Sequence, residues 1–109
     1  MTNIEFEQIT RQIVNKLRCD YSPQKIILFG SYLSDSPHSD SDIDLLIIKD
    51  TNERFIDRWV AVRKILSDPN RKVAIDTFVL SPLEVSERLN RGDQFLADII
   101  KRGKVLYAA

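Results

Sequence analysis

The sequence KIILFGS at residues 25–31, followed after ten further residues by DIDLLII at residues 42–48, sets the architecture of this chain. Each stretch is short and almost continuously apolar, as expected of a strand buried on both faces. Gly30-Ser31 ends the first strand, and acidic residues open the second. Residues 32–41 have the composition of a loop, so we expect two strands joined by a loop.

Helices are expected on both sides of these strands. Apolar residues recur at helical spacing in segments that span residues 3–19, 52–67, 82–90 and about 95–100. Ser81, Pro82 and Glu84 have the spacing of a capping box, which starts the third helix, and Gly103 ends the fourth. Residues 72–80 and 104–107 are predicted to be extended.

The predicted fold class is α/β (α+β), with a short mixed β-sheet of three to four strands flanked by helices. The chain has 109 residues and a mass of 12.6 kDa, which is room for one domain, residues 1–109. With 43% hydrophobic and 29% charged residues, it has the composition of a packed globular protein.

Charge and cysteine content exclude several classes of function. The 16 basic and 16 acidic side chains cancel, so we expect no direct binding of nucleic acid. One cysteine and one histidine cannot supply an internal disulfide or a structural zinc site. No apolar run is long enough to span a membrane, and the N-terminus lacks the layout of a signal peptide. We therefore expect a cytoplasmic protein without a membrane partner.

The candidate chemistry lies at the strand ends. Side chains alternate along a strand, so Asp42 and Asp44 point the same way, and two carboxylates this close need a cation, for which Mg²⁺ or Mn²⁺ is the simplest choice. If the third strand lies beside the second, Asp76 completes a cluster able to hold two metal ions about 3.5–4 Å apart. Gly30 and Ser31 end a strand where backbone N–H groups attract phosphate.

Simpler interpretations of the same residues remain open. The two acids of the second strand could be a solvated loop end, Asp76 could face water at a sheet edge, Gly30 could serve a turn, and Ser31 could cap a helix. Trp59 is predicted to be a core residue rather than a base-stacking platform. The stripe of Phe95, Leu96, Ile99 and Ile100 fits either core or a subunit interface.

Gly30-Ser31, ten intervening residues and then Asp42-Ile43-Asp44 resemble the signature of the polymerase-beta-like nucleotidyltransferase superfamily. More specifically, the chain resembles the minimal nucleotidyltransferases that act as antitoxins of HEPN-domain toxins. The resemblance extends to Ile75-Asp76-Thr77, where that family places its third acid. It implies transfer of a nucleoside monophosphate from an NTP to a hydroxyl group, with release of pyrophosphate.

The resemblance also implies a role for each site residue. Asp42 and Asp44 would bind both Mg²⁺ ions, and Asp76 would bind the ion that activates the acceptor hydroxyl and would accept its proton. Gly30 and Ser31 would hold the β- and γ-phosphates of the substrate, ATP.

This chain differs from many members of the family in the residues that could balance the negative charge of the triphosphate. Many relatives have Arg-Gly in the loop, where this chain has Ser34-Asp35. The remaining candidates for balancing that charge are Lys25, Lys49, Arg71 and Lys72.

The acceptor that the resemblance implies is a tyrosine of a HEPN-type toxin encoded by an adjacent gene, which AMP addition would silence. The chain would then work in a hetero-oligomer or as a homodimer. One alternative is transfer to a small molecule such as an aminoglycoside, although such enzymes usually carry an extra helical domain for the acceptor. The other alternative is a non-catalytic antitoxin that neutralises its partner by binding alone.

Overall fold

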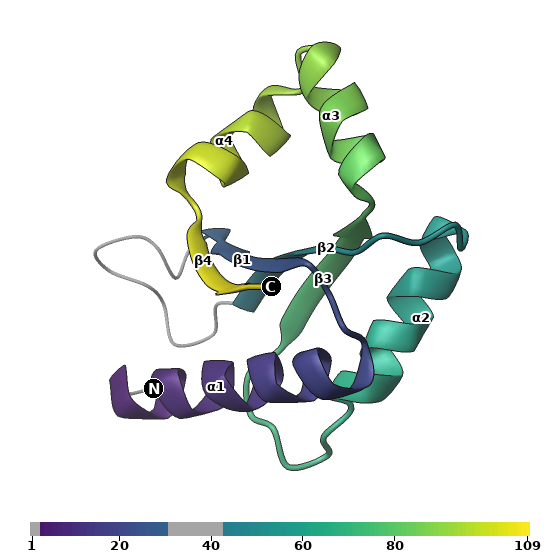
Figure 1. Cartoon of the computed structure of the whole chain (residues 1–109). Coiled ribbons are helices and arrows are strands. Elements are labelled where there is room, and N and C mark those ends of the chain that lie inside the picture. Colours follow the sequence, from purple (N-terminus) through teal and green to yellow (C-terminus); the bar gives the residue numbers. More distant parts are fainter. Residues whose placement is uncertain (1–2, 31–42) are drawn as a thin grey trace.

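A computed structural model describes residues 3–30 and 43–109 of the chain. In these residues, four strands form one sheet in the order β3-β2-β1-β4 (Figure 1). The strands are β1 (Lys25–Phe29), β2 (Ile43–Ile48), β3 (Ile75–Leu80) and β4 (Lys104–Ala108). β2 and β3 are parallel, whereas β1 is antiparallel to both β2 and β4. The predicted mixed sheet and α/β class are confirmed.

Helices cover both faces of the sheet, giving three layers (Figure 1). The helices are α1 (Asn3–Asp20), α2 (Phe55–Leu66), α3 (Pro82–Asn90) and α4 (Gln94–Arg102). α1 and α2 pack on one face, and α3 and α4 lie over the other. No helix in the described ranges is both long and apolar enough to cross a membrane.

Alternation along β2 divides its side chains between two hydrophobic cores. Ile43, Leu45 and Ile47 belong to the core under α1 and α2. Leu46 belongs to the core under α4, and Asp44, two residues before it, lies on the same face. β2 is therefore apolar on both faces, except at Asp44, which lies near its start on the α3–α4 face.

The α3–α4 hairpin follows the predicted capping chemistry. The Ser81 Oγ accepts a hydrogen bond from the Glu84 N–H at 3.2 Å, and the Glu84 carboxylate accepts one from the Ser81 N–H at 2.7 Å. Gly92, with φ +82°, separates the two helices. Gly103 ends α4 as predicted, but with φ −65°, so its lack of a side chain serves close packing rather than a left-handed turn. An added Cβ there would overlap the Ile99 carbonyl oxygen.

α2 buries only some of its apolar residues. Val62 and Leu66 are buried, and one turn before Val62 the core position is taken by Arg58, only 6% exposed. Trp59 is 36% exposed, with the Arg63 guanidinium 4.8 Å from its ring, so its predicted place in the core is wrong. α2 begins at Phe55, after the predicted start, and no side chain caps its first turn.

Buried Arg58 joins α2 to the start of α3. Its guanidinium donates hydrogen bonds to Glu84 Oε1 at 2.5 Å and to the carbonyl oxygens of Glu53 at 2.8 Å and Val79 at 3.3 Å. Partial burial acts to raise the pKa of Glu84, but the hydrogen bonds from Arg58 and Ser81 outweigh it and hold that pKa below its usual range. The carboxylate of the capping box thus also neutralises the buried cation.

Candidate functional site

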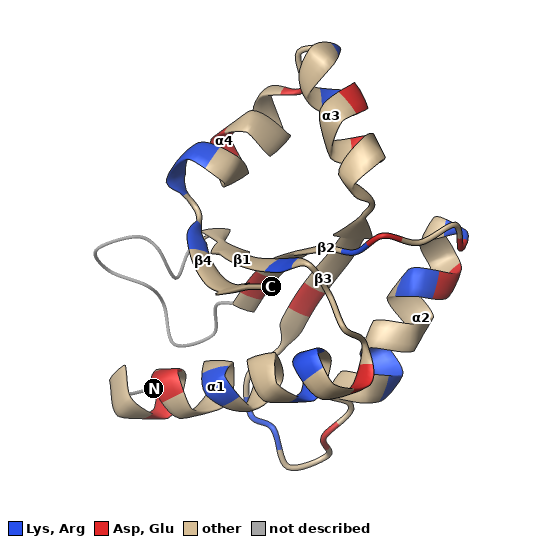
Figure 2. Cartoon of the chain, viewed as in Figure 1, with Lys and Arg blue, Asp and Glu red and all other residues tan. Residues whose placement is uncertain are grey.

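Asp44 on β2 and Asp76 on β3 are direct partners in the parallel ladder. The prediction that the third strand lies beside the second is therefore confirmed. Residues paired in register on adjacent strands share a face of the sheet, so both carboxylates lie on the α3–α4 side. Figure 2 shows the two acidic positions next to each other on β2 and β3. The fold thus brings together two carboxylates that are far apart in the sequence.

Gly30 lies next to Asp44 of the acidic pair, Asp44 and Asp76. It follows β1, whose last residue, Phe29, is the antiparallel partner of Asp44. Its φ of +84° lies in the left-handed region, and an added Cβ would overlap Asp44 Oδ2 and lie 3.1 Å from Asp44 Cγ. Backbone and carboxylate therefore approach each other as closely as a glycine permits.

Two further predicted site residues, Ser31 and Asp42, lie outside the described residues, and their roles remain predictions. Within residues 3–30 and 43–109, no group of three His, Cys, Asp or Glu side chains is placed to hold a metal ion. The described part of the site therefore consists of Gly30, Asp44 and Asp76.

A groove of about 620 Å³ lies beside β3 and the last turns of α2, with Asp76 in its wall. Three basic residues, Arg63, Lys64 and Arg71, also line it, as does Trp59. Its size is that of a small-molecule site. No local sequence pattern predicts this groove, because α2 and β3 are brought together only by the tertiary fold.

The four basic residues considered for the triphosphate are distributed unevenly. Lys25 pairs with Ile48, at the end of the sheet opposite to the Phe29–Asp44 pair. Lys49 follows Ile48, and its ammonium donates a hydrogen bond to the carbonyl oxygen of Tyr21 and lies 4.6 Å from that ring's centroid. Both lysines are thus remote from the acids.

Arg71 and Lys72 lie nearer to the groove beside Asp76. Arg71 lines that groove, and its guanidinium donates a hydrogen bond to the Leu66 carbonyl at 2.5 Å. Lys72 lines a separate hollow beside α1. Of the four candidates, Arg71 therefore lines the same groove as the site residue Asp76.

The acidic pair is also bordered by aromatic residues that the sequence analysis did not single out. Phe29 is the ladder partner of Asp44, and Phe78 follows Asp76 by two positions on the same face of β3. The spacing in β3 was a usable signal, because residues two apart on a strand share a face. The position of Phe95 beside them, on α4, was not predictable locally.

Residues 11–109, which include all of β1 to β4, match the polymerase beta nucleotidyltransferase family. The chain belongs to this family. A protein of Methanocaldococcus jannaschii, provisionally named a protein adenylyltransferase, is 31% identical over 103 residues, which cover 93% of this chain and 97% of that one. The resemblance noted in the sequence is confirmed, and the chain is a nucleotidyltransferase.

Solved structures agree with this assignment. A chain of a toxin–antitoxin complex crystallised with AMP-PNP has 25% identity and a TM-score of 0.62, with coverage of 92% of this chain and 73% of that one. A nucleotidyltransferase structure from Sulfolobus solfataricus, itself provisionally named, has a TM-score of 0.66 at 18% identity, with coverage of 96% and 82%. The second comparison supports the nucleotidyltransferase fold.

The described residues fit a divalent cation of the kind that nucleotidyltransferases use. Asp44 and Asp76 offer adjacent oxygen ligands of the type that Mg²⁺ prefers. Gly30 lacks the Cβ that would overlap Asp44 Oδ2, so this carboxylate lies directly against the Gly30 backbone. The chemistry of these ligands therefore fits a hard divalent cation.

Proposed function

We propose that this nucleotidyltransferase is magnesium-dependent and moves AMP from ATP to a tyrosine of a HEPN-type toxin, acting as an antitoxin in the cytoplasm. The observation that carries the proposal is the ladder pairing of Asp44 with Asp76 beside Gly30. Support for the nucleotide comes from the similar toxin–antitoxin structure with AMP-PNP, and support for the reaction comes from the name of the Methanocaldococcus jannaschii relative.

The proposed site residues are Asp42, Asp44 and Asp76 as metal ligands, and Gly30 and Ser31 as phosphate-binding residues. When bound, Mg²⁺ supplies positive charge that offsets the triphosphate and lowers the pKa of a coordinated hydroxyl. Asp44 and Asp76 would hold the ions, and the backbone at Gly30, whose φ is +84°, would bind the phosphates.

In the proposed reaction, the acceptor hydroxyl oxygen forms a bond to the α-phosphorus of ATP as the bond from that phosphorus to the pyrophosphate oxygen breaks. Asp76 accepts the hydroxyl proton, and pyrophosphate leaves. Asp76 suits this role because it lies on the edge strand and is exposed, so an acceptor can reach its carboxylate. Arg63 and Arg71 line the neighbouring groove on the α2 side of β3 and give it positive charge.

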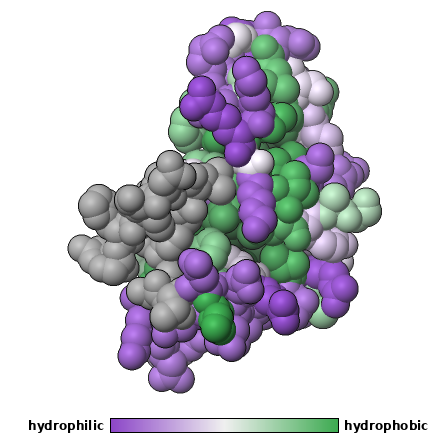
Figure 3. Space-filling view, turned by 90° about the vertical axis from the view of Figure 1, so that its left-hand side faces the viewer, coloured by the Kyte–Doolittle hydropathy of each residue, from purple (hydrophilic) through white to green (hydrophobic). Residues whose placement is uncertain are grey.

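The partner is proposed because the similar structure with AMP-PNP is that of a toxin–antitoxin complex. The described surface has apolar areas on which another protein could pack. On α2, Ile56 and Val60 are exposed, and on α4 and β4 Ile100 and Val105 are exposed. Figure 3 shows a band of hydrophobic side chains on the side of α4 and β4.

The test is the intact mass of the toxin encoded by the neighbouring gene after incubation with this chain, ATP and Mg²⁺. We expect a gain of one or more AMP units, abolished by Asp44→Asn and by Asp76→Asn. Asp57→Asn is a matched control, because Asp57 is a half-exposed aspartate on α2 that pairs with Arg54.

Two outcomes would contradict the proposal. A stable complex without any mass gain would favour neutralisation by binding alone. Transfer of AMP to a small hydroxylated molecule such as an aminoglycoside, with the toxin unmodified, would favour a small-molecule transferase.

A further inference from the structure

Three phenylalanine rings from different elements meet next to the acidic pair, and we call them the aromatic cluster: Phe29 on β1, Phe78 on β3 and Phe95 on α4. Phe29 contacts the other two edge-to-face, with ring centroids 5.8 Å from Phe78 and 5.9 Å from Phe95. Phe78 and Phe95 are nearly parallel, with an interplanar angle of 26° and centroids 6.5 Å apart. Two rings of the cluster thus share one orientation.

The outer ring of the cluster is open to solvent. Phe95 is 63% exposed, although it lies one residue before Leu96, which is fully buried. Leu96 and Ile99 already fix α4 to the sheet, so the core does not require a large ring at position 95. A ring of this size usually gains stability from burial, and its exposure beside a reaction site indicates a ligand surface.

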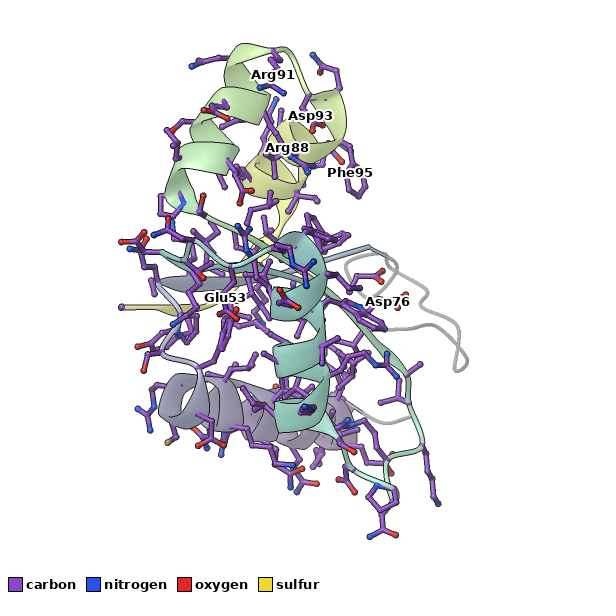
Figure 4. All side chains as sticks on the ribbon, turned by 90° about the vertical axis from the view of Figure 1, so that its right-hand side faces the viewer. Glu53, Asp76, Arg88, Arg91, Asp93 and Phe95 are labelled. Carbon is purple, nitrogen blue, oxygen red and sulfur yellow. The ribbon has the colours of Figure 1, made fainter. Side chains whose placement is uncertain are left out.

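The aromatic cluster lies close enough to the carboxylates of Asp44 and Asp76 for one bound nucleotide to contact both. Phe29 pairs with Asp44, and Phe78 is two residues from Asp76, which is about 7 Å along a strand. Figure 4 shows Phe95 on α4 above Asp76 on β3. A triphosphate held at the acids would therefore place its nucleoside close to these rings.

We propose that Phe95, supported by Phe78 and Phe29, stacks on the purine base of the donor nucleotide. This inference rests on the proposed function, because it takes the acidic pair as the triphosphate site. Aromatic rings stack on any base, and more strongly on the larger purines. Because the cluster carries no hydrogen-bonding group, it selects purines over pyrimidines without separating adenine from guanine.

The test measures binding of α,β-methylene-ATP, which cannot release pyrophosphate, by calorimetry in the presence of Mg²⁺. We expect Phe95→Ala to weaken binding about tenfold, which corresponds to about 1.4 kcal/mol. Phe95→Leu should have a similar effect while it keeps an apolar side chain on α4. Phe95→Trp should retain or improve the affinity.

Three comparisons separate stacking from other effects. Phe55→Ala changes a comparably exposed phenylalanine, 49% exposed, on α2 and should leave binding unchanged. Inorganic tripolyphosphate lacks the base, so its affinity should be the same for the unmodified chain and for Phe95→Ala. The α,β-methylene analogue of GTP should lose affinity in Phe95→Ala as the ATP analogue does.

The stacking proposal is overturned if Phe95→Ala and Phe95→Leu bind the ATP analogue as tightly as the unmodified chain. It is also overturned if they keep that affinity but transfer AMP more slowly to the toxin, because the ring would then contact the acceptor. If the unmodified chain binds neither tripolyphosphate nor the analogue, the triphosphate site itself is wrong, and the proposed function fails first.

Discussion

Replacing Gly30 by alanine tests how closely the backbone and the Asp44 carboxylate are packed, and Gly92→Ala is its control. The two glycines have nearly the same backbone conformation, with φ of +84° and +82°. The added Cβ at Gly92 meets nothing within 4 Å, whereas at Gly30 it overlaps Asp44 Oδ2. Differences between the two variants therefore report the contact with Asp44 and not the backbone strain.

The expected changes in stability follow from two contributions, the backbone strain and the contact with Asp44. A left-handed conformation costs an alanine roughly 1–2 kcal/mol, and the loss of chain freedom in the unfolded state returns about 0.4–1 kcal/mol, equally at both sites. At Gly30, Asp44 must also turn away from its preferred rotamer, for about 0.5–1.5 kcal/mol more. We expect Gly30→Ala to be less stable than Gly92→Ala by about 1 kcal/mol, or a melting temperature lower by about 4–8 °C.

Urea unfolding of the single variants and of Gly30→Ala in an Asp44→Ala background measures these terms. In that background the cost of Gly30→Ala should fall to that of Gly92→Ala. AMP transfer should fall on the order of 100-fold in Gly30→Ala, since a shift of about 1 Å in a reacting group has that effect, and should be unchanged in Gly92→Ala. Equal stability and equal transfer in the two variants would mean that Gly30 and Asp44 are not in close contact.

Three further predictions concern the polar groups between the layers. Arg58→Leu should lower the free energy of unfolding by about 3 kcal/mol in urea titrations, because it removes charged hydrogen bonds and leaves the Val79 carbonyl unpaired; a loss below about 1 kcal/mol would contradict this. Because the folded-state pKa of Glu84 is lowered, the stability it contributes is present above its unfolded pKa of about 4.3 and is lost as the pH falls through the folded pKa. Glu84→Gln should flatten the decline of stability below about pH 5, and an unchanged acid limb would show that other carboxylates cause it. The Tyr21 hydroxyl is buried without a hydrogen-bond partner among the described residues, and burial raises its pKa. Tyr21→Phe should therefore leave the free energy of unfolding unchanged or raise it by about 1 kcal/mol.

Local patterns predicted much of the fold. The apolar run of β1 gave its bounds, Lys25–Phe29, and the Ser81–Glu84 capping box gave the start of α3. Both depend on residues a few positions apart. β3 begins at Ile75, later than predicted, because its ladder with β2 starts at the Ile43–Ile75 pair, a boundary set by the partner strand.

α2 shows where such patterns are insufficient. Apolar residues occur on several sides of this helix, so its sequence does not define one core face. The sheet and α1 decide that Val62 and Leu66 are buried, while Phe55 is left exposed. A charged residue, Arg58, takes a core position because Glu84 of another helix neutralises it.

For the site, local sequence was enough to predict the type of chemistry. The signals were a glycine that ends a strand, an Asp-x-Asp whose two acids alternation predicts to share one face, and a resemblance to the family that the comparisons confirmed. The assembled sheet and helices were needed to show that Asp76 is the ladder partner of Asp44 and that Phe95 completes an aromatic cluster beside them. The physical reason is that alternation and capping act within a few residues, whereas strand pairing and helix docking depend on surfaces assembled from the whole chain.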